Sequence, residues 1–541
     1  MWGFVIQLAR SGFNKQSVIK GALVLTIAGI FIRILGAVYR VPLGRLLGAE
    51  GLGIYGLPNY FYLLFFTLSS AGIPVAVARL VSEKMAVGRY RDAYRTFRLA
   101  RFSMFVIGLV ASLSLFLGAE WLVKSGIVAD PRCYNGLRAI SPVVFFAAVT
   151  AAYRGLFQGV RNMTAVAVSQ VADQVMLVAG TLILAYLFLP RGLAWAAAGA
   201  NMGAIPGAVA ATGIMLFYHW LYRGEFHRLM ASDTSGRREG PLSLLKKIFA
   251  TAIPISFAAI AMALTGILDN KLIIDRLQLV GYSMSEATEA YGQFTQMAMS
   301  FINIAIAFAV SLGANLVPSV AEVYSAGNMQ HIRRQVSRAV RLAVVFSLPA
   351  AAGLFVLAPH LTYLVFADRE AGIPLAWVSW VVIFWAVHLV TTGVLQGLGR
   401  ADIPVRSLIT GIAFKIGITY YLVTTPLGVR AAAIGTVAMF VVASFLNILA
   451  IRKRVGFDFH FGKTVVRPSI AVLIMVVGVS KIYQMFSVQV GNNWATLLAV
   501  CAGAIIYAPV VVMVGGITSR EVGAVPVIGE KIAPIMRKFG R

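Results

Sequence analysis

Charged residues are scarce in this chain of 541 residues, at 12% of the sequence, roughly half the share typical of soluble domains. Acidic residues are scarcer than basic ones, with 20 Asp and Glu against 47 Lys and Arg. Two cysteines, Cys133 and Cys501, give neither a disulfide framework nor a cysteine metal site. The sequence also lacks a phosphate-binding Walker loop and paired metal-ligand histidines. These absences exclude a soluble enzyme, a disulfide-stapled secreted domain and a disordered tail, and they predict no cofactor.

Long apolar segments, by contrast, fill the chain, and 59% of its residues are hydrophobic. A membrane-spanning helix needs about 20 consecutive apolar residues. Segments of this kind, separated by charged or Gly/Pro-containing turns, fall at 20–44, 54–80, 99–123, 137–157, 164–189, 192–221, 248–274, 291–320, 339–366, 373–398, 404–425, 429–451, 465–486 and 493–517. The sequence therefore predicts an all-α polytopic membrane protein with about 14 transmembrane helices.

The formal net charge of +27 is concentrated in alternate loops. Basic loops at 89–98, 223–247, 331–338 and 452–454 fall on one side of the predicted membrane, while the loop at 277–290 on the other side is acidic. Because basic loops stay in the cytoplasm, this pattern predicts that both termini are cytoplasmic. It also explains the positive charge without a nucleic-acid partner.

Two short motifs recur at nearly the same spacing. LFQG (156–159) returns as VLQG (394–397), and Glu83 with Gly88 returns as Glu322 with Gly327. An even number of spans per copy gives parallel repeats, and a transport site is expected between the two halves. The predicted organisation is two six-helix lobes with two extra helices, divided into an N-terminal lobe (1–222), a cytoplasmic linker (223–247), a C-terminal lobe (248–452), and the last two spans with a cytoplasmic tail (453–541).

Two arginines lie inside the first predicted span, in FIRILGAVYR (31–40). Arg33 and Arg40 are seven residues apart and therefore share one helix face. A bare arginine at mid-bilayer costs at least about 2.5–3.5 kcal/mol, so the pair should face a polar cavity or form structural ion pairs. Gly36 between them leaves room for a bulky ligand, and Arg45 either joins them or extends to the outer interface.

Charged residues also follow a Gly/Pro interruption in the second span, AGIP (71–74). The corresponding span of the second half carries Gly313 and Pro318, and paired interruptions of this kind point to a transport site. Arg79, Glu83 and Glu322 are candidates for a cytoplasmic gate, although solvated interfacial charges explain them equally simply. Arg79 and Glu83 have the i, i+4 spacing of a helical ion pair.

Further polar residues fall inside predicted spans. Gln293, Gln296 and Asn303 either line a cavity or hydrogen-bond between helices. Asp173, Asp269 and Lys415 must each be paired, neutralised or in contact with water, and they are the candidates for ion coupling.

The stretch from KGALVLTIAGIFIRILGAVYRVPLGRLLG to VSEKMAVGRYRDA (20–93) resembles the stage V sporulation protein B family of polysaccharide biosynthesis proteins. That family belongs, with the lipid II flippases, to the multidrug/oligosaccharidyl-lipid/polysaccharide exporter superfamily. The resemblance implies two lobes arranged in a V that alternate between inward-open and outward-open states. It also implies a groove for a lipid tail beside the last two spans, and a cationic cavity that binds the diphosphate of an undecaprenyl-linked sugar.

The resemblance transfers only some of the family's site residues. The arginine of the first span matches Arg33, whereas the next one falls on Tyr39 with Arg40 beside it. The LPN motif matches residues 57–59 and places Asn59 in the cavity lining, but the apolar run 62–66 replaces the arginine that follows it. The diphosphate-binding set is then Arg33, Arg40, Arg45 and Lys271.

Together these features predict a non-enzymatic flippase of the plasma membrane that moves lipid II or a similar precursor from the inner to the outer leaflet. A membrane potential or an H⁺ or Na⁺ gradient would drive it. Its partners are the lipid-linked oligosaccharide and the phospholipid bilayer, and it is expected to be a monomer. Two alternatives stay open: a cation-coupled multidrug exporter of the same superfamily, and a non-transporting scaffold for wall or spore-cortex assembly.

Overall fold

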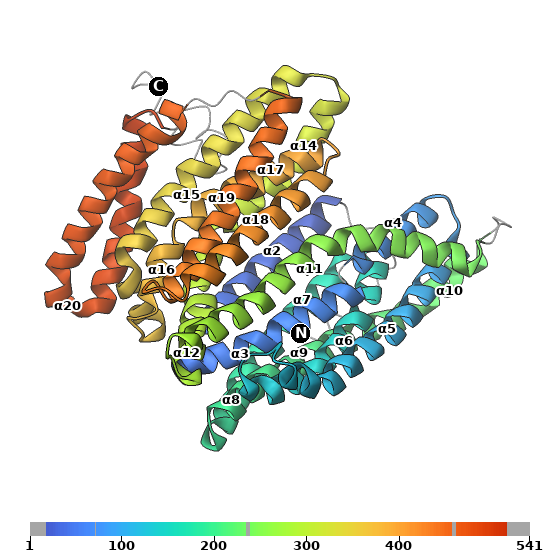
Figure 1. Ribbon diagram of the computed structural model, residues 1–541. Coiled ribbons are helices and arrows are strands. Elements are labelled where there is room, and N and C mark those ends of the chain that lie inside the picture. The colour runs from blue at the N-terminus through green and yellow to red at the C-terminus, as the bar shows by residue number, and fades with distance from the viewer. Residues whose placement is uncertain (1–17, 71, 234–238, 457–460, 517–541) are drawn as a thin grey trace. The chain divides into compact units, whose positions relative to one another are not determined.

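The computed structural model describes residues 18–70, 72–233, 239–456 and 461–516, and within these ranges every regular element is a helix (Figure 1). The all-α fold predicted from the sequence is therefore confirmed. The chain divides into two compact units, Met1–Lys271 and Leu272–Arg541.

The described residues of the first unit form nine helices and most of a tenth. They are α2 (Val18–Val38), α3 (Arg40–Ser70), α4 (Ile73–Ala86), α5 (Tyr90–Lys124), α6 (Tyr134–Gly159), α7 (Met163–Phe188), α8 (Leu193–Met202), α9 (Ala204–Leu221), α10 (Arg223–Ala231) and α11 (Pro241–Leu279). Short 3₁₀ turns at Pro131–Cys133 and Leu189–Arg191 precede α6 and α8. Helix α11 continues past Lys271 into the second unit.

The described residues of the second unit also form helices. Its elements are α12 (Met284–Gly292), the π-helix η3 (Gln293–Ala298), α13 (Met299–Ala305), α14 (Ala307–Ser325), α15 (Met329–Phe366), α16 (Gly372–Val378), α17 (Val381–Gly397), α18 (Asp402–Leu422), α19 (Val429–Arg454), the π-helix η4 (Gly462–Val466) and α20 (Arg467–Met513).

Among the described residues, nine helices are long and apolar enough to cross a membrane, or ten if the bent pair α16 and α17 counts as one span. Two of these helical stretches each hold two predicted spans, because the chain turns at a glycine inside them. Gly48 (φ 66°) lies between predicted spans 20–44 and 54–80, and Gly491 (φ 75°) lies between the last two. Both positive φ values favour glycine over any residue with a Cβ atom. The chain is a multi-pass membrane protein.

Three stretches differ from the sequence-based expectation. The described residues of the predicted linker 223–247 are largely helical, since they hold α10 and the start of α11. Helix α10 forms because Phe226 buries itself against the first unit while Arg223, His227 and Arg228 remain exposed. The predicted loop 277–290 contains α12, which begins with a Ser283/Glu286 capping box. The predicted span 291–320 is divided into η3, α13 and α14.

The internal repeat is visible in how glycines pack. A Cβ atom on Gly159 of α6 would meet the side chain of Val81 in α4 at 2.8 Å, and one on Gly397 of α17 would meet Val320 in α14 at 2.8 Å. Gly159 and Gly397 are 238 positions apart, and Val81 and Val320 are 239 apart, which are the spacings of the two sequence motifs. The motifs therefore mark equivalent close helix contacts inside each unit.

Candidate functional site

Arg33 and Arg40 lie at the junction of α2 and α3. The helical hydrogen bonds continue through this junction, since Tyr39 donates to the carbonyl of Leu35 and itself accepts from Leu43. The two arginines are therefore about 10 Å apart along one helical path. Arg33 is exposed and Arg40 half-buried, and in the described part of the chain neither lies within ion-pairing distance of a carboxylate. Two positive charges in the first span are left for another partner.

The junction between α2 and α3 is close to a polar cluster that joins α3 to α8. The Asn59 amide donates to the Tyr55 carbonyl at 2.9 Å and to the side-chain oxygen of Asn201 at 3.1 Å. Asn201 is buried and donates in turn to the Tyr55 carbonyl at 3.3 Å. Asn59, predicted to line the cavity, is thus held in place by a neighbouring helix, and Arg40 lies close enough to Tyr55 to interact electrostatically.

Helix α11 brings a second polar group to the same unit. The ring of Tyr60 packs directly over Gly266, where a Cβ atom would collide with it. Asp269 and Arg40 both lie close enough to Tyr60 to interact with it electrostatically. The Lys271 amine instead donates to the Gly126 carbonyl in the turn after α5, so Lys271 is held at that turn.

An ion pair between α6 and α7 accounts for Asp173. The Arg154 guanidinium donates to the Asp173 carboxylate at 3.2 Å and to the Ser169 hydroxyl at 3.1 Å. The two charged side chains are 21% and 33% exposed, so the pair is partly buried. Tyr62 lies within electrostatic range of both charges. Sequence reasoning missed Arg154, although its place two residues before the repeated LFQG motif was a usable signal.

The polar candidates of the second unit differ in their surroundings. The Gln293 amide donates to the Asp368 carboxylate at 3.1 Å, which supports the turn between α15 and α16. Gln296 is half-buried and Asn303 is exposed. Lys415 is buried, and its helix packs closely against Gly435 of α19.

The residues proposed as a gate lie at the surface. Arg79 and Glu83 form the predicted i, i+4 ion pair at 2.7 Å, and their side chains are 66% and 54% exposed. Glu322 is also exposed, near the end of α14. An exposed pair of this kind adds little stability, so the gate role stays a prediction.

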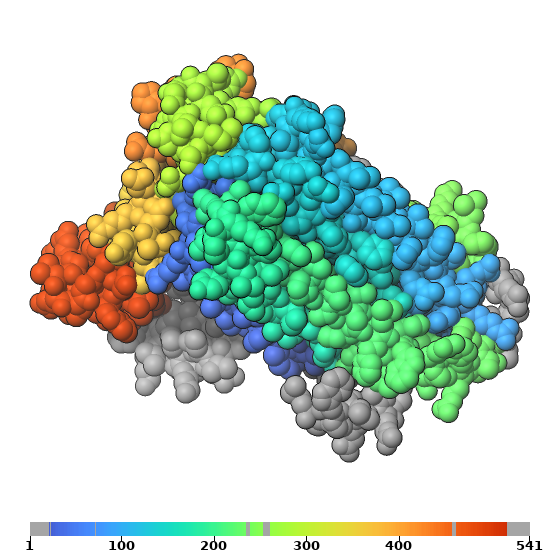
Figure 2. Space-filling view, turned by 90° about the horizontal axis from the view of Figure 1, so that it is seen from below, coloured from blue at the N-terminus to red at the C-terminus, as the bar shows by residue number. Residues whose placement is uncertain are grey.

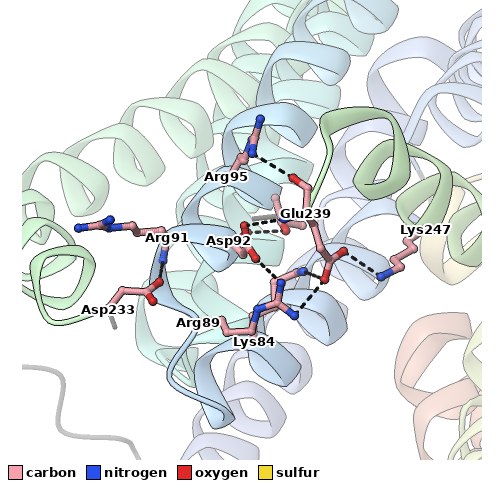
Figure 3. Close-up of polar contacts among 9 residues, drawn as sticks. Lys84, Arg89, Arg91, Asp92, Arg95, Asp233, Glu239 and Lys247 are labelled. Atoms are coloured by element: carbon pink, nitrogen blue, oxygen red, sulfur yellow. Dashed lines mark hydrogen bonds and ion pairs between the residues drawn. The ribbon is translucent and has the colours of Figure 1, made fainter. Parts of the chain in front are cut away.

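A larger ionic cluster beside this pair was not expected from the sequence (Figure 3). Glu239, just before α11, accepts from Lys84 at 2.8 Å and from Lys247 at 2.8 Å, and lies 3.4 Å from Arg89. Arg89 also contacts Asp92 at 2.5 Å. The Lys247 and Lys84 hydrogen bonds lower the pKa of the Glu239 carboxyl to about 2. We call Lys84, Arg89, Asp92, Glu239 and Lys247 the linker cluster, because it fastens the chain before α11 to the α4–α5 turn.

Within the described ranges, no group of three or more His, Cys, Asp or Glu side chains is placed to hold a metal ion. His388, a lone histidine inside α17, is buried and hydrogen-bonded to Asn447 at 3.3 Å, which is a packing role. What the arrangement offers is charge recognition: exposed and half-buried arginines near tyrosine and asparagine side chains, all in the first unit.

Comparison with known proteins agrees with this description. Residues 18–324, more than half of the chain, match the polysaccharide biosynthesis protein family, and residues 294–421 match the MatE family. Stage V sporulation protein B of Bacillus subtilis (strain 168) is 27% identical over 96% of this chain and 99% of its own length. The lipid II flippase MurJ of the same organism is 24% identical over 91% of this chain and 94% of its own length.

Solved structures share the fold. A lipid II flippase MurJ in an inward-closed conformation aligns with a TM-score of 0.66 at 13% identity, covering 91% of this chain and 98% of the other. An inward-facing multidrug resistance MATE transporter aligns with a TM-score of 0.62 at 17% identity, covering 78% and 94%. The resemblance first noted in residues 20–93 is confirmed over nearly the whole chain.

Proposed function

This chain is a member of the polysaccharide biosynthesis protein family, and from that premise we propose that it is a flippase for an undecaprenyl-diphosphate-linked cell-wall precursor, most specifically lipid II. The observation that carries the proposal is the pair Arg33 and Arg40, two arginines in the first span with no carboxylate partner among the described residues. One sequence relative and one solved structure are lipid II flippases by name, and another solved structure is a transporter, so the chain is accordingly a transporter rather than an enzyme.

The chemistry of a diphosphate fits this pair. Planar guanidinium groups bind phosphate oxygens with two parallel hydrogen bonds, and such charge-assisted bonds are about twice as strong as neutral ones. A charged headgroup cannot cross bare hydrocarbon without a large desolvation cost, so a polar path is required. The tyrosine and asparagine side chains near Arg40 would supply neutral donors along that path.

The direction of movement follows from charge. An anionic headgroup that leaves a negative cell interior moves down the membrane potential, a gain of about 2.3 kcal/mol per negative charge per 100 mV. We therefore propose that the potential contributes to the driving force, and that an H⁺ or Na⁺ gradient is a second source. The same proposal places the chain in the plasma membrane as a monomer, with both termini cytoplasmic.

The test is binding of lipid II to the purified full chain, measured by native mass spectrometry. Undecaprenyl phosphate and a different lipid-linked sugar are the comparison ligands. We expect selective binding of lipid II that weakens at least about tenfold in Arg33→Gln and in Arg40→Gln, since each loses one charge-assisted contact. Arg191→Gln, the same change at an exposed arginine stacked on Phe188, is the matched control.

The outcomes separate the candidates. Equal binding of all three lipids would indicate a general polyprenyl-phosphate carrier. If the Arg33 and Arg40 substitutions leave lipid II binding unchanged, these two arginines do not form the diphosphate site. The MatE match over residues 294–421 supports a second candidate, a cation-coupled multidrug exporter. That candidate requires transport of a lipophilic cation that survives Arg33→Gln.

A further inference from the structure

A separate cavity of about 940 Å³ lies in the first unit between α5, α9 and α10. Five arginines line it: Arg91, Arg95, Arg98, Arg101 and Arg223. The four on α5 recur every three or four residues and therefore form one stripe along a single face of the helix. The space-filling view shows the blue surface of α5 against the green surface of α10 on this side of the unit (Figure 2).

The protein neutralises only part of the charge of this cavity, since the Asp233 carboxylate accepts from the Arg91 backbone amide at 2.7 Å. Its one lining carboxylate, Asp92, is already engaged by Arg89 at 2.5 Å. Arg91 and Arg95 donate to the backbone carbonyls of Met230 and Glu239, contacts that orient both guanidinium groups without cancelling their charge. In the part of the chain that the structure describes, Arg98 and Arg223 have no ion pair.

The lining also carries aromatic side chains. Tyr94, Tyr153 and two histidines, His219 and His227, border the arginines. The Tyr94 and His219 rings stack with centroids 6.1 Å apart, and the Tyr94 hydroxyl is 3.4 Å from the His219 Nε2 atom. These rings hold the wall of the cavity in place between α5 and α9.

The surface next to the arginines is apolar and exposed. Beyond Arg101, α5 presents Phe102 and Phe105, which are 69% and 47% exposed. On α9, Trp220 lines the cavity and is 67% exposed, and Phe217 adjoins it at 36%. Tryptophan is typical of the boundary between the headgroups and the hydrocarbon of a membrane. The cavity therefore suits an amphiphilic ligand, whose anionic headgroup would contact the arginines while its apolar chain lies against the exposed aromatic side chains.

We propose that this cavity binds the phosphate headgroup of an anionic phospholipid, with the lipid chains lying along the exposed faces of α5 and α9. Basic pockets between helices at the membrane surface suit lipid phosphates, and arginines bind phosphate oxygens through their paired donors. The site is distinct from Arg33 and Arg40, which lie on α2 and α3. It is independent of the proposed substrate, and an occupied site would tie α10 to the membrane surface.

The test is lipid retention by the purified full chain in native mass spectrometry, with phosphatidylglycerol as the probe and phosphatidylcholine as its zwitterionic counterpart. We expect phosphatidylglycerol to bind at least about tenfold more tightly, and Arg98→Gln/Arg223→Gln to remove about tenfold of that affinity. Arg452→Gln/Arg454→Gln, the same charge change on exposed residues of α19, should leave binding unchanged.

Two further variants make the result specific. Arg98→Lys/Arg223→Lys keeps the charge but not the paired donors, so it should restore part of the affinity, which separates recognition from misfolding. Arg33→Gln/Arg40→Gln should bind phosphatidylglycerol as the wild type does. Three results would overturn the proposal. The first is equal binding of the two lipids, and the second is unchanged binding by Arg98→Gln/Arg223→Gln. The third is displacement of phosphatidylglycerol by millimolar inorganic phosphate, which would identify a site for a free phosphate.

Discussion

Glu239 of the linker cluster is the position where one substitution should have the largest electrostatic effect on stability. Glu239→Gln keeps the shape of the side chain and removes its charge. The Lys84 side chain, 7% exposed and 2.8 Å from Glu239, is then left as a buried cation without its carboxylate. Lys247 loses the same partner but is half exposed, so water can solvate it.

The magnitude follows from that burial. Removing one partner of a fully buried ion pair costs about 3–5 kcal/mol, because an uncompensated charge remains. Glu239 itself is 20% exposed and glutamine still offers an oxygen to Lys84, so we expect a smaller loss of about 2 kcal/mol in the free energy of unfolding. Glu120→Gln is the control, since Glu120 pairs with Lys124 at 2.6 Å but both side chains are largely exposed, and it should change stability little.

The effect should depend on pH in one direction. The Glu239 carboxyl has a pKa of about 2 in the folded chain and 4.5 as an ordinary glutamate. A pKa lowered by folding stabilises the protein above about pH 4.5, and that stabilisation is lost as the pH falls toward 2. The difference between the wild type and Glu239→Gln should therefore be full at pH 7 and shrink between pH 4.5 and pH 3.

The assay is thermal unfolding of the purified chain in detergent, read as the fraction that remains folded after heating, together with hydrogen exchange of residues 89–95. We expect faster exchange there, because the Glu239 amide donates to Asp92 at 3.4 Å. Lys84→Met/Glu239→Gln should be more stable than Glu239→Gln alone, since it removes the buried cation. The reasoning would be refuted if the stability losses of the two single substitutions simply add in Lys84→Met/Glu239→Gln. It would also be refuted if Glu239→Gln and Glu120→Gln lose equal stability.

Three further substitutions test contacts inside each of the two units, in the same unfolding assay. Gly397→Ala should cost about 1–3 kcal/mol by overpacking α17 on α14, whereas Gly353→Ala, with open space around it, should not destabilise. Asn447→Ala should cost about 1–3 kcal/mol, because it removes the buried amide that donates to a threonine of α17 at 3.1 Å. Arg154→Gln should cost about 1.5–3 kcal/mol, because it leaves the partly buried Asp173 carboxylate without its cationic partner. Arg154→Gln/Asp173→Asn should recover part of that stability, because it removes the unpaired charge.

The sequence predicts the elements of this fold better than their contacts. Apolar length and Gly/Pro punctuation predict long apolar helices, and the described residues contain nine or ten that could cross a membrane. The i, i+4 spacing correctly pairs Arg79 with Glu83, because both lie on one helix. Lys84 and Glu239 are 155 positions apart, and their contact depends on how the chain before α11 meets the α4–α5 turn. Helical periodicity relates only residues a few positions apart, so the linker cluster could not be predicted from the sequence.

Helical structure in the predicted linker shows a different limit. Hydrophilic composition predicted a loop at 223–247, yet the buried Phe226 side chain and the hydrogen bond from Arg91 to the Met230 carbonyl dock the nine residues of α10. A stripe of one or two apolar residues is too weak a signal to separate a short surface helix from a loop. The lipid cavity proposed above depends on this helix, and so its lining could not be assembled from the sequence.

The two copies of the repeat share their packing but not their charged residues. The contacts of Gly159 and Gly397 show that α6 with α4 and α17 with α14 pack alike. At the offset of 238 positions, however, Arg154 corresponds to Thr392. Arg154 pairs with a carboxylate, whereas the Thr392 hydroxyl lies 3.5 Å from the His388 ring in a neutral, buried group. Backbone packing is thus shared between the two units at this position, while the polar chemistry is not.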